Sequence, residues 1–177
     1  MDGLAEVAVE RLEAPIARHD LDALSELLID AVNGNASIGF PAGVSKTEAD
    51  DFWVGVEGDV AAGRAVLLGA RLDGRLAATA QLRFPPFPNG RNRAEVAKVL
   101  AHSSVRRRGL ATALMGEIER AAMEAGRGLL FLDTETGSPA EQLYGGLGWT
   151  RAGMVPDFAY RPDGELRPTS FFYKILD

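Results

Sequence analysis

The sequence predicts a single domain built on a mixed α/β sheet with helices on its faces. Three observations support this prediction. The chain of 177 residues suits one domain of ordinary size. Short apolar runs of strand character alternate with amphipathic segments of helical spacing. The expected order is one strand, two helices, three strands, a helix, a strand, a helix and two strands, without internal repeats or a linker that would divide residues 1–177.

The first elements are a strand and two helices. The segment 4–12 is rich in apolar and β-branched residues and is typical of a strand. Leucines at helical spacing predict a helix over 21–32, with Asp20 as its N-cap. Thr47 and Asp50 then suggest a capping box at the start of a second helix.

A hairpin and a third long strand follow. The segments 64–72 and 75–84 flank Asp73-Gly74, and such a pair between apolar runs is a strong hairpin signal. After a loop over 85–92, the segment 94–102 alternates in its first residues and is expected to be a strand.

The last part of the chain adds two helices and three strands. The helix after residue 109 places apolar side chains on one face and ends at Gly126 or Gly128. The apolar run 128–135 indicates a buried central strand. The remaining expected elements are a helix over 139–147, with Ser138 as N-cap and Pro139 at its first position, and strands over 149–155 and 170–176.

Composition excludes several classes of site. The chain has no cysteine, so disulfides, thiolate metal sites and cysteine nucleophiles are excluded. Because it has only two histidines, His19 and His102, we expect no bound metal. No apolar run reaches the roughly 20 residues that span a bilayer, and no secretory signal is evident. The expectation is a cytoplasmic protein without a membrane partner.

Charge points to a small anionic ligand. The formal net charge is −6, whereas Arg106, Arg107 and Arg108 form one local basic cluster. A nucleic-acid-binding domain would carry a basic face or stripe, so we expect no nucleic-acid partner. The short cluster has the size of a site for a small anion.

The same cluster stands where a helix is expected to begin. Cations at a helix N-terminus cost about 0.3–1 kcal/mol each, and Gly109 in the first turn adds to this cost. Both features become favourable if the free N–H groups of the helix start bind phosphate and Gly109 lets the backbone approach it. The alternative is an ordinary solvated run of charge. The segment 106–111 has neither the Gly-Lys-Ser/Thr end of a P-loop nor the G-x-G-x-x-G of a dinucleotide fold.

The segment 106-RRRGLA-111, between a strand and a helix, resembles the Arg/Gln-x-x-Gly-x-Gly/Ala motif of the GCN5-related N-acetyltransferases, the GNAT family. The expected order of elements matches the fold of that family. Four further stretches resemble corresponding stretches of one member of the family: 34-GNASIGF-40, 88-PNGRNRAEVAKV-99, 128-GLLFLDTETGSPAEQLY-144 and 162-PDGELRPTSFFYK-174.

This resemblance implies the acyl-CoA N-acyltransferase fold, with about seven mostly antiparallel strands, a central parallel pair and about four helices. It also implies that acetyl-CoA binds where the parallel strands, 94–102 and 128–133, separate. Backbone groups of Leu100, Ala101 and His102 would then bind the pantetheine. The residues implied for the pyrophosphate are Arg106, Arg107, Arg108, Gly109, Leu110, Ala111 and Thr112.

The implied activity is direct attack of an acceptor amine on the thioester in a ternary complex. A base must take a proton from the amine, and Glu95 and Asp133 are the candidates. Tyr144, which would lie beside the sulfur, is the candidate acid. A backbone N–H near Ala101 would polarise the carbonyl. Each side chain also has a purely structural interpretation. Tyr144 would pack in the core, Asp133 would be a capping or solvated loop residue, and Glu95 would be an exposed strand residue.

The resemblance also implies an acceptor site under the loop 33–43. Asn33, Asn35, Ser37 and Glu135 are candidate acceptor contacts, with a plain flexible loop as the alternative for 33–43. Arg83 and Arg93 are candidates for binding an acceptor carboxylate. The leading expectation is the amine of a small molecule such as a toxin or antibiotic. Peptide N-termini, polyamines and a catalytically silent acyl-CoA-binding module remain open alternatives. A homodimer with 171–173 at its interface is a further possibility.

Overall fold

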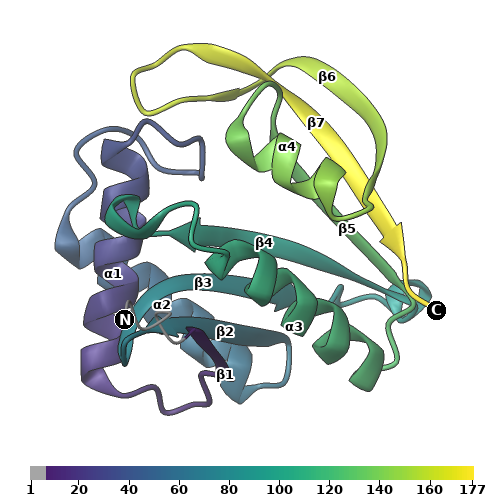
Figure 1. Ribbon diagram of the computed structural model, residues 1–177, viewed down its shortest axis with the longest axis horizontal. Helices are drawn as coiled ribbons and strands as arrows, with labels where there is room; N and C mark the ends of the chain where they lie inside the picture. Colours follow the sequence, from purple (N-terminus) through teal and green to yellow (C-terminus); the bar gives the residue numbers. More distant parts are fainter. Residues whose placement is uncertain (1–6) are drawn as a thin grey trace, which may run out of the picture.

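The computed structural model describes residues 7–177 and contains one seven-stranded sheet of order β1-β2-β3-β4-β5-β7-β6 (Figure 1). All neighbouring strands are antiparallel except β4 and β5. The expected mixed sheet with four helices and a central parallel pair is therefore confirmed. The strands are β1 Val7–Arg11, β2 Ala65–Leu72, β3 Arg75–Arg83, β4 Arg93–Ala101, β5 Leu129–Glu135, β6 Thr150–Tyr160 and β7 Leu166–Ile175. The helices are α1 Arg18–Asn33, α2 Lys46–Ala61, α3 Leu110–Glu124 and α4 Pro139–Gly146, with short 3-10 turns at Pro88–Gly90 and Ser103–Val105.

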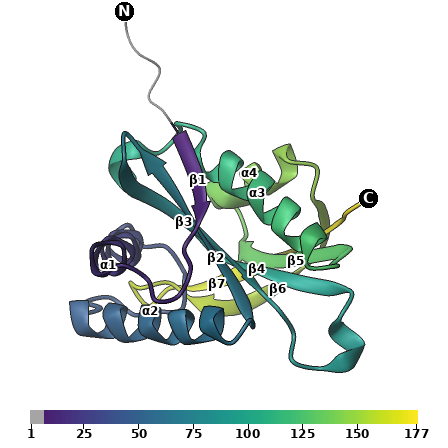
Figure 2. The ribbon, with the colours of Figure 1, turned by 90° about the horizontal axis from the view of Figure 1, so that it is seen from below.

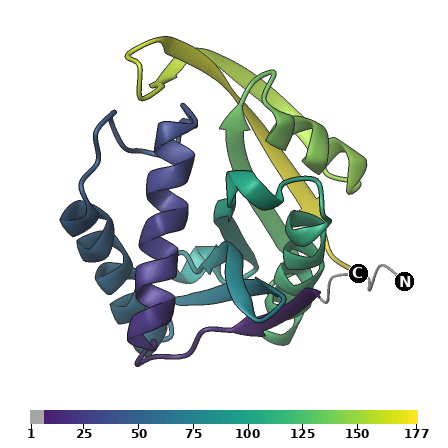
Figure 3. The same cartoon turned by 60° about the vertical axis from the view of Figure 1, so that its left-hand side comes forward.

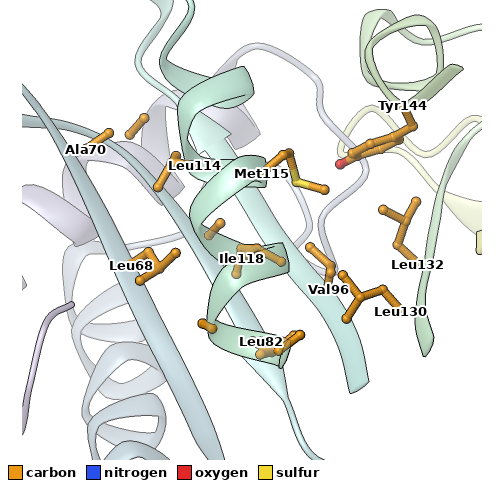
Figure 4. Packing of buried hydrophobic residues seen from close by; sticks show 14 of the residues in the cluster. Leu68, Ala70, Leu82, Val96, Leu114, Met115, Ile118, Leu130, Leu132 and Tyr144 are labelled. Atoms are coloured by element: carbon orange, nitrogen blue, oxygen red, sulfur yellow. The ribbon is translucent and has the colours of Figure 1, made fainter. Parts of the chain in front are cut away.

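The helices cover the sheet in two layers. Helices α1 and α2 lie on one side, and α3 and α4 lie on the other (Figure 2). Apolar residues of α3, such as Leu114 and Ile118, pack with Leu130 and Leu132 of the central strand (Figure 4). On the opposite face, α1 and α2 bury a second cluster around Trp53. Two cores thus fix the sheet from both sides and make it a rigid support.

The central parallel pair is joined at one end only. Pairing of β4 with β5 covers Arg93–Glu95 and Leu129–Phe131 and stops there, although both strands continue. The two strands diverge beyond this point (Figure 1). Backbone N–H and C=O groups on the facing edges therefore lack sheet partners and are available to a ligand.

A bulge in β4 changes which side chains face α1 and α2. Thr79 pairs with Leu100 and Gln81 with Ala97, so the two residues Lys98 and Val99 lie opposite the single residue Ala80. A bulge of this kind shifts the alternation of side chains by one position. Before it, Ala94 and Val96 face the α3 core, whereas after it, Val99 and Ala101 do so.

Two of the expected helix caps are wrong. Helix α1 begins at Arg18 after the uncapped Ala17, and Asp20 lies in its first turn. The buried Asp20 carboxylate instead accepts hydrogen bonds from Arg71 of β2 at 2.9 and 3.0 Å. Helix α2 has its capping box at Ser45 and Glu48, two residues before the expected one. A paired Ser-x-x-Glu satisfies the first N–H groups in both directions, which explains why this register is preferred.

The last two strands are longer than the sequence indicated. They extend to Tyr160 and back to Leu166, and only a tight turn over 161–165 separates them. The shorter prediction followed from the turn residues Pro162, Asp163 and Gly164 together with Pro168. Pro156 and Pro168 cannot donate a ladder hydrogen bond, yet β6 and β7 continue through them. Both prolines lie where the β6–β7 register shifts, between the pairs Val155–Thr169 and Ala159–Arg167.

Two other expectations concern the ends of the sheet. The expected first strand began at residue 4, and residues 4–6 lie outside the described residues. Strand β7 lies between β5 and β6, so the segment 171–173 is not at a sheet edge. None of the helices in residues 7–177 is long and apolar enough to cross a bilayer.

Candidate active site

The start of α3 offers free N–H groups to an anion. Gly109 is the N-cap, with a left-handed φ of 79°, and no side chain in the described part of the chain caps the helix. The first turn contains no acidic residue. The N–H groups of Leu110, Ala111 and Thr112 consequently have no intrahelical acceptor, and such a terminus binds phosphate well.

The three arginines before Gly109 are free to reach such an anion. Arg106, Arg107 and Arg108 are all exposed, and none forms an ion pair with another of residues 7–177. Arg107 has a positive φ of 64°, which turns the chain toward the helix. Uncapped amides beside unpaired guanidinium groups fit a pyrophosphate, because both kinds of donor bind phosphate oxygens. The observed loop therefore has the donors that the sequence predicted for this segment.

Helix α1 fixes the chain that enters this loop. Asp30 accepts hydrogen bonds from the Ser103 N–H at 2.8 Å and from the Ser103 hydroxyl at 2.6 Å. The His102 ring accepts from the Ser104 N–H at 3.2 Å, and the His102 N–H donates to Ala77 of β3. Since neighbouring residues of a strand point their amides to opposite sides, Ala101 is the residue whose backbone faces the separated strands. The N–H of His102 is not available to pantetheine.

Tyr144 lies deep beside the separated strands. Ser138 caps α4 and Pro139 begins it, as expected. The Tyr144 side chain is 5% exposed and packs against Trp149 and Phe172. Its hydroxyl end points toward Met115 of α3 (Figure 4). Burial, with a smaller effect of the Asp133 charge, raises the pKa of Tyr144 to about 12, so the hydroxyl remains a donor near neutral pH.

Asp133 lies on the opposite face of the sheet from the α3 core. Leu130 and Leu132 of β5 belong to that core, so the alternation of the strand turns Asp133 toward the α1 and α2 side. The residue is open to solvent, yet the surrounding protein removes enough water to raise the pKa of its carboxyl. The nearby Lys98 ammonium opposes this rise.

Glu95 lies on the same face of the sheet as Asp133. Its carboxylate is 3.6 Å from the Arg83 guanidinium on β3. Arg83 is therefore engaged by a carboxylate of the site itself. Arg93 lies at the beginning of β4, where the strands are still paired, and donates to the carbonyl of Asn89 at 3.2 Å.

Most of the expected acceptor contacts have protein partners. The Asn35 side-chain NH₂ donates to the Asp163 carboxylate, and the Asn35 side-chain oxygen accepts from the Asp163 N–H. The Ser37 hydroxyl donates to the carbonyl of Tyr160 at 3.0 Å. Glu135 pairs with Arg161 and Arg167. Asn33 is exposed at the end of α1. These contacts tie the loop after α1 to the β6–β7 turn, which arches over it in Figure 3, and a direct contact with the acceptor stays a prediction.

Lys98 was not among the site residues predicted from the sequence. Its φ of 50° is left-handed, although it belongs to a strand. Five non-glycine residues within 7–177 have positive φ; three are Asn or Asp, which tolerate it, and the others are Lys98 and Arg107. Such a backbone costs about 1–3 kcal/mol and often marks a functional site. The spacing of Glu95 and Lys98, three residues apart in an otherwise small and apolar strand, was the available signal for the bulge.

Comparisons with known proteins agree with this geometry. Residues 39–149 match the model of the acetyltransferase (GNAT) family. The chain is similar in structure to the ribosomal-protein-alanine N-acetyltransferase of Brucella melitensis, with 23% identity, a TM-score of 0.80 and coverage of 96% of this chain and 99% of that one. It is also similar to the yncA protein of Salmonella typhimurium, solved with its cofactor acetyl-CoA, with 20% identity, a TM-score of 0.79 and coverage of 97% and 94%. An N-acetyltransferase of Staphylococcus aureus Mu50 gives 16% identity, a TM-score of 0.80 and coverage of 98% and 100%.

At these identities the solved structures establish the fold, whereas the family match establishes the relationship, because it spans more than half of the chain. The matched segment contains the parallel pair, the arginine loop and Tyr144. The family uses acetyl-CoA, and the uncapped start of α3 has the donors that its pyrophosphate requires. The chain is an acetyltransferase of the GNAT family.

Proposed function

We propose that this protein transfers the acetyl group of acetyl-CoA to the amine of a small molecule, by direct attack in a ternary complex. One observation carries the proposal. Glu95 and Asp133 lie on the α1 and α2 side of the sheet near the point where β4 and β5 separate, and Tyr144 lies on the α3 side, close enough to feel the Asp133 charge. The uncapped start of α3 follows the end of β4. This arrangement supports the proposal, because the candidate anchor for the cofactor and the candidate proton-transfer groups flank the same pair of strands.

The cofactor would be held by backbone groups. Ala101 offers its N–H and C=O to the pantetheine, and the amides of residues 110–112 with Arg106–Arg108 bind the pyrophosphate. Bound acetyl-CoA supplies the acetyl group as a thioester. The Ala101 N–H also polarises the carbonyl oxygen as negative charge develops there.

Different side chains act on the acceptor amine and on the leaving sulfur. Glu95 or Asp133 takes the proton of the acceptor amine, either directly or through a water. Tyr144 donates a hydrogen bond to the departing sulfur. Because the pKa of Tyr144 is about 12 and that of a thiol is near 8.5, hydrogen bonding to the thiolate is favoured over complete proton transfer.

The preferred acceptor is a small amino-acid-like molecule. The four stretches described above resemble the tabtoxin resistance acetyltransferase, whose acceptor class is represented by tabtoxinine-β-lactam. The loop after α1 covers the side of the sheet that carries Glu95 and Asp133. The ring centres of Phe40 in this loop and Phe52 on α2 are 5.4 Å apart. Peptide N-termini, as in the Brucella protein's name, and polyamines are the competing acceptors. A silent acyl-CoA-binding module would keep the arginine loop without needing the carboxylates.

The homodimer remains a proposal with a changed location. Exposed apolar side chains gather on the edge strand β6, where Met154, Val155, Phe158 and Tyr160 lie. An exposed apolar patch of this kind marks an interaction surface more often than scattered apolar residues do.

An acceptor screen tests the proposed function. The protein is incubated with acetyl-CoA and a panel of amino acids, β-lactam amino acids, peptides and polyamines, and products are identified by mass spectrometry. We expect acetylation of a small amino-acid-like amine, and a loss of turnover in Asp133→Asn and Tyr144→Phe. Full activity of both variants would overturn the assignment of these residues. Saturable binding of CoA without turnover on the whole panel would instead support the silent module.

A further inference from the structure

We propose that Lys98 determines acceptor specificity by binding a carboxylate that the acceptor carries next to its reactive amine. This inference rests on the proposed function and deepens it. The acceptor is then an α-amino acid with a free carboxylate, and Lys98 takes the role that the resemblance implied for Arg83 or Arg93.

Lys98 is the lysine that forms no ion pair with a carboxylate of the described residues, 7–177. The chain has three lysines, Lys46, Lys98 and Lys174. Lys46 pairs with Asp22 and Asp50, and Lys174 pairs with Glu119 at 2.6 Å. Within residues 7–177, no carboxylate lies within ion-pair distance of the Lys98 ammonium. A half-buried cation of this kind offers its donors to a ligand.

The bulge in β4 places the Lys98 ammonium close to the loop after α1, residues 34–45. It lies 5.5 Å from the centre of the Phe52 ring on α2, within cation–π distance. A Cβ built on Gly39 of the loop would be 3.9 Å from the Lys98 Nζ. The side chain thus lies between the loop, α2 and the sheet, on the face that carries Glu95 and Asp133.

The charges around Lys98 match a zwitterion. The Asp133 and Glu95 carboxylates attract its ammonium, and the Arg83 guanidinium repels it. Burial dominates these effects and lowers the pKa of Lys98. An acceptor carboxylate would offset this cost of burial, because it supplies the missing counter-ion. The carboxylates of Asp133 and Glu95 would then receive the acceptor's amine.

This arrangement discriminates between the candidate acceptors. The N-terminal residue of a peptide has an amide in place of the free carboxylate, so Lys98 would find no anion there. A polyamine would place a second cation near the Lys98 ammonium and would be repelled. An α-amino acid satisfies both charge signs at once.

The test measures binding to the CoA-saturated protein by calorimetry. The probes are two matched pairs, L-methionine with L-methioninamide and L-glutamine with L-glutaminamide, at one pH and ionic strength. For each pair, the ratio of the amide Kd to the acid Kd is compared between the wild type and Lys98→Met. We expect the wild-type ratio to exceed the variant ratio by on the order of 10- to 100-fold. Comparing ratios cancels the different amine pKa values of acid and amide.

Two further variants make the result specific. Lys46→Met removes the same charge from an exposed pair on α2 and should leave the ratio unchanged. Lys98→Arg keeps the positive charge and should restore most of the wild-type ratio of the amide Kd to the acid Kd. Unchanged CoA affinity checks that Lys98→Met is folded. An equal loss of acid and amide binding, or a wild-type ratio near one, overturns the proposal. Because the readout is binding, it decides the point even if no acceptor is acetylated and the proposed function fails.

Discussion

At the scale of single residues, the surroundings decide what each side chain can do. Tyr144 is enclosed by Trp149 and Phe172, and burial raises its pKa to about 12. The Asp133 carboxyl has a raised pKa for the same reason, since removal of water disfavours its charged form. Folding thus keeps the Tyr144 hydroxyl protonated, as a hydrogen-bond donor, and makes the Asp133 carboxylate more basic.

The pH dependence of turnover follows from these directions. Because the pKa of Tyr144 is about 12, the tyrosine stays protonated and kcat should show no fall between about pH 8 and pH 10. Because the pKa of Asp133 is raised, its carboxylate is lost at a higher pH than an ordinary aspartate as the solution is acidified. Tyr144→Phe should lower kcat by on the order of 10- to 100-fold and leave the KM for acetyl-CoA nearly unchanged.

Steady-state kinetics from acid to alkaline pH check this prediction. The acid limb should disappear in Asp133→Asn if this residue is the base, whereas its survival would leave Glu95 in that role. A fall of kcat between pH 8 and pH 10 that vanishes in Tyr144→Phe would contradict the raised pKa of Tyr144.

At the scale of elements, the start of α3 combines poor helix chemistry with good anion chemistry. Gly109 has a φ of 79°, which strains any residue with a side chain, and Arg107 is already left-handed. The same helix contains Gly116 on its exposed face, where an added Cβ would meet nothing within 4 Å. A side chain at position 109 would therefore be strained by the backbone, whereas a side chain at position 116 would be accommodated.

Alanine substitutions separate these two positions. Gly109→Ala should lower the free energy of unfolding by about 1–2 kcal/mol and also weaken CoA binding. Gly116→Ala should raise the free energy of unfolding by about 0.5–1 kcal/mol with unchanged CoA affinity. Denaturant unfolding and calorimetric CoA titration measure both effects. Equal effects of the two substitutions would argue against a special backbone at Gly109.

At the scale of the whole molecule, two distant segments contact each other beside the proposed acceptor site. Asn35 after α1 and Asp163 in the β6–β7 turn share two hydrogen bonds, although 128 residues separate them. The Ser37 hydroxyl and the Ala42 N–H add bonds to Tyr160 and Pro162. Asp163 accepts from the Glu165 N–H and from Asn35, which lowers its pKa. The contact is therefore present above the ordinary aspartate pKa and weakens as acid protonates this group.

Breaking this contact should change acceptor binding alone. Asp163→Ala removes the acceptors for Asn35, so we expect faster hydrogen exchange over 33–43 and a severalfold higher KM for the acceptor. The KM for acetyl-CoA should not change, because the arginine loop is held by Asp30 of α1. Exchange mass spectrometry and kinetics are the measurements. Unchanged exchange in this loop would show that the other bonds suffice to hold it.

The sequence by itself determined the features that depend on neighbouring residues. The Asp73-Gly74 hairpin, the Ser138 cap and the arginine loop before Gly109 all follow from local spacing, because the groups that interact are a few residues apart. The order of elements also followed, since apolar periodicity reports which face each segment buries. Asp133 was a candidate because it ends the central apolar strand, whereas Tyr144 was a candidate because of the resemblance to the GNAT family.

Only the tertiary structure decided which distant groups meet. Asp20 looked like a helix cap and instead binds Arg71, and Glu135 looked free and instead pairs with Arg161 and Arg167. The bulge at Lys98 depends on how β4 pairs with β3. Such pairings join residues far apart in the chain, and their energies depend on packing and burial that local propensity does not encode. The proposed cofactor loop could therefore be recognised in the sequence, whereas the proposed acceptor site depends on how the strands, the loop after α1 and the β6–β7 turn come together.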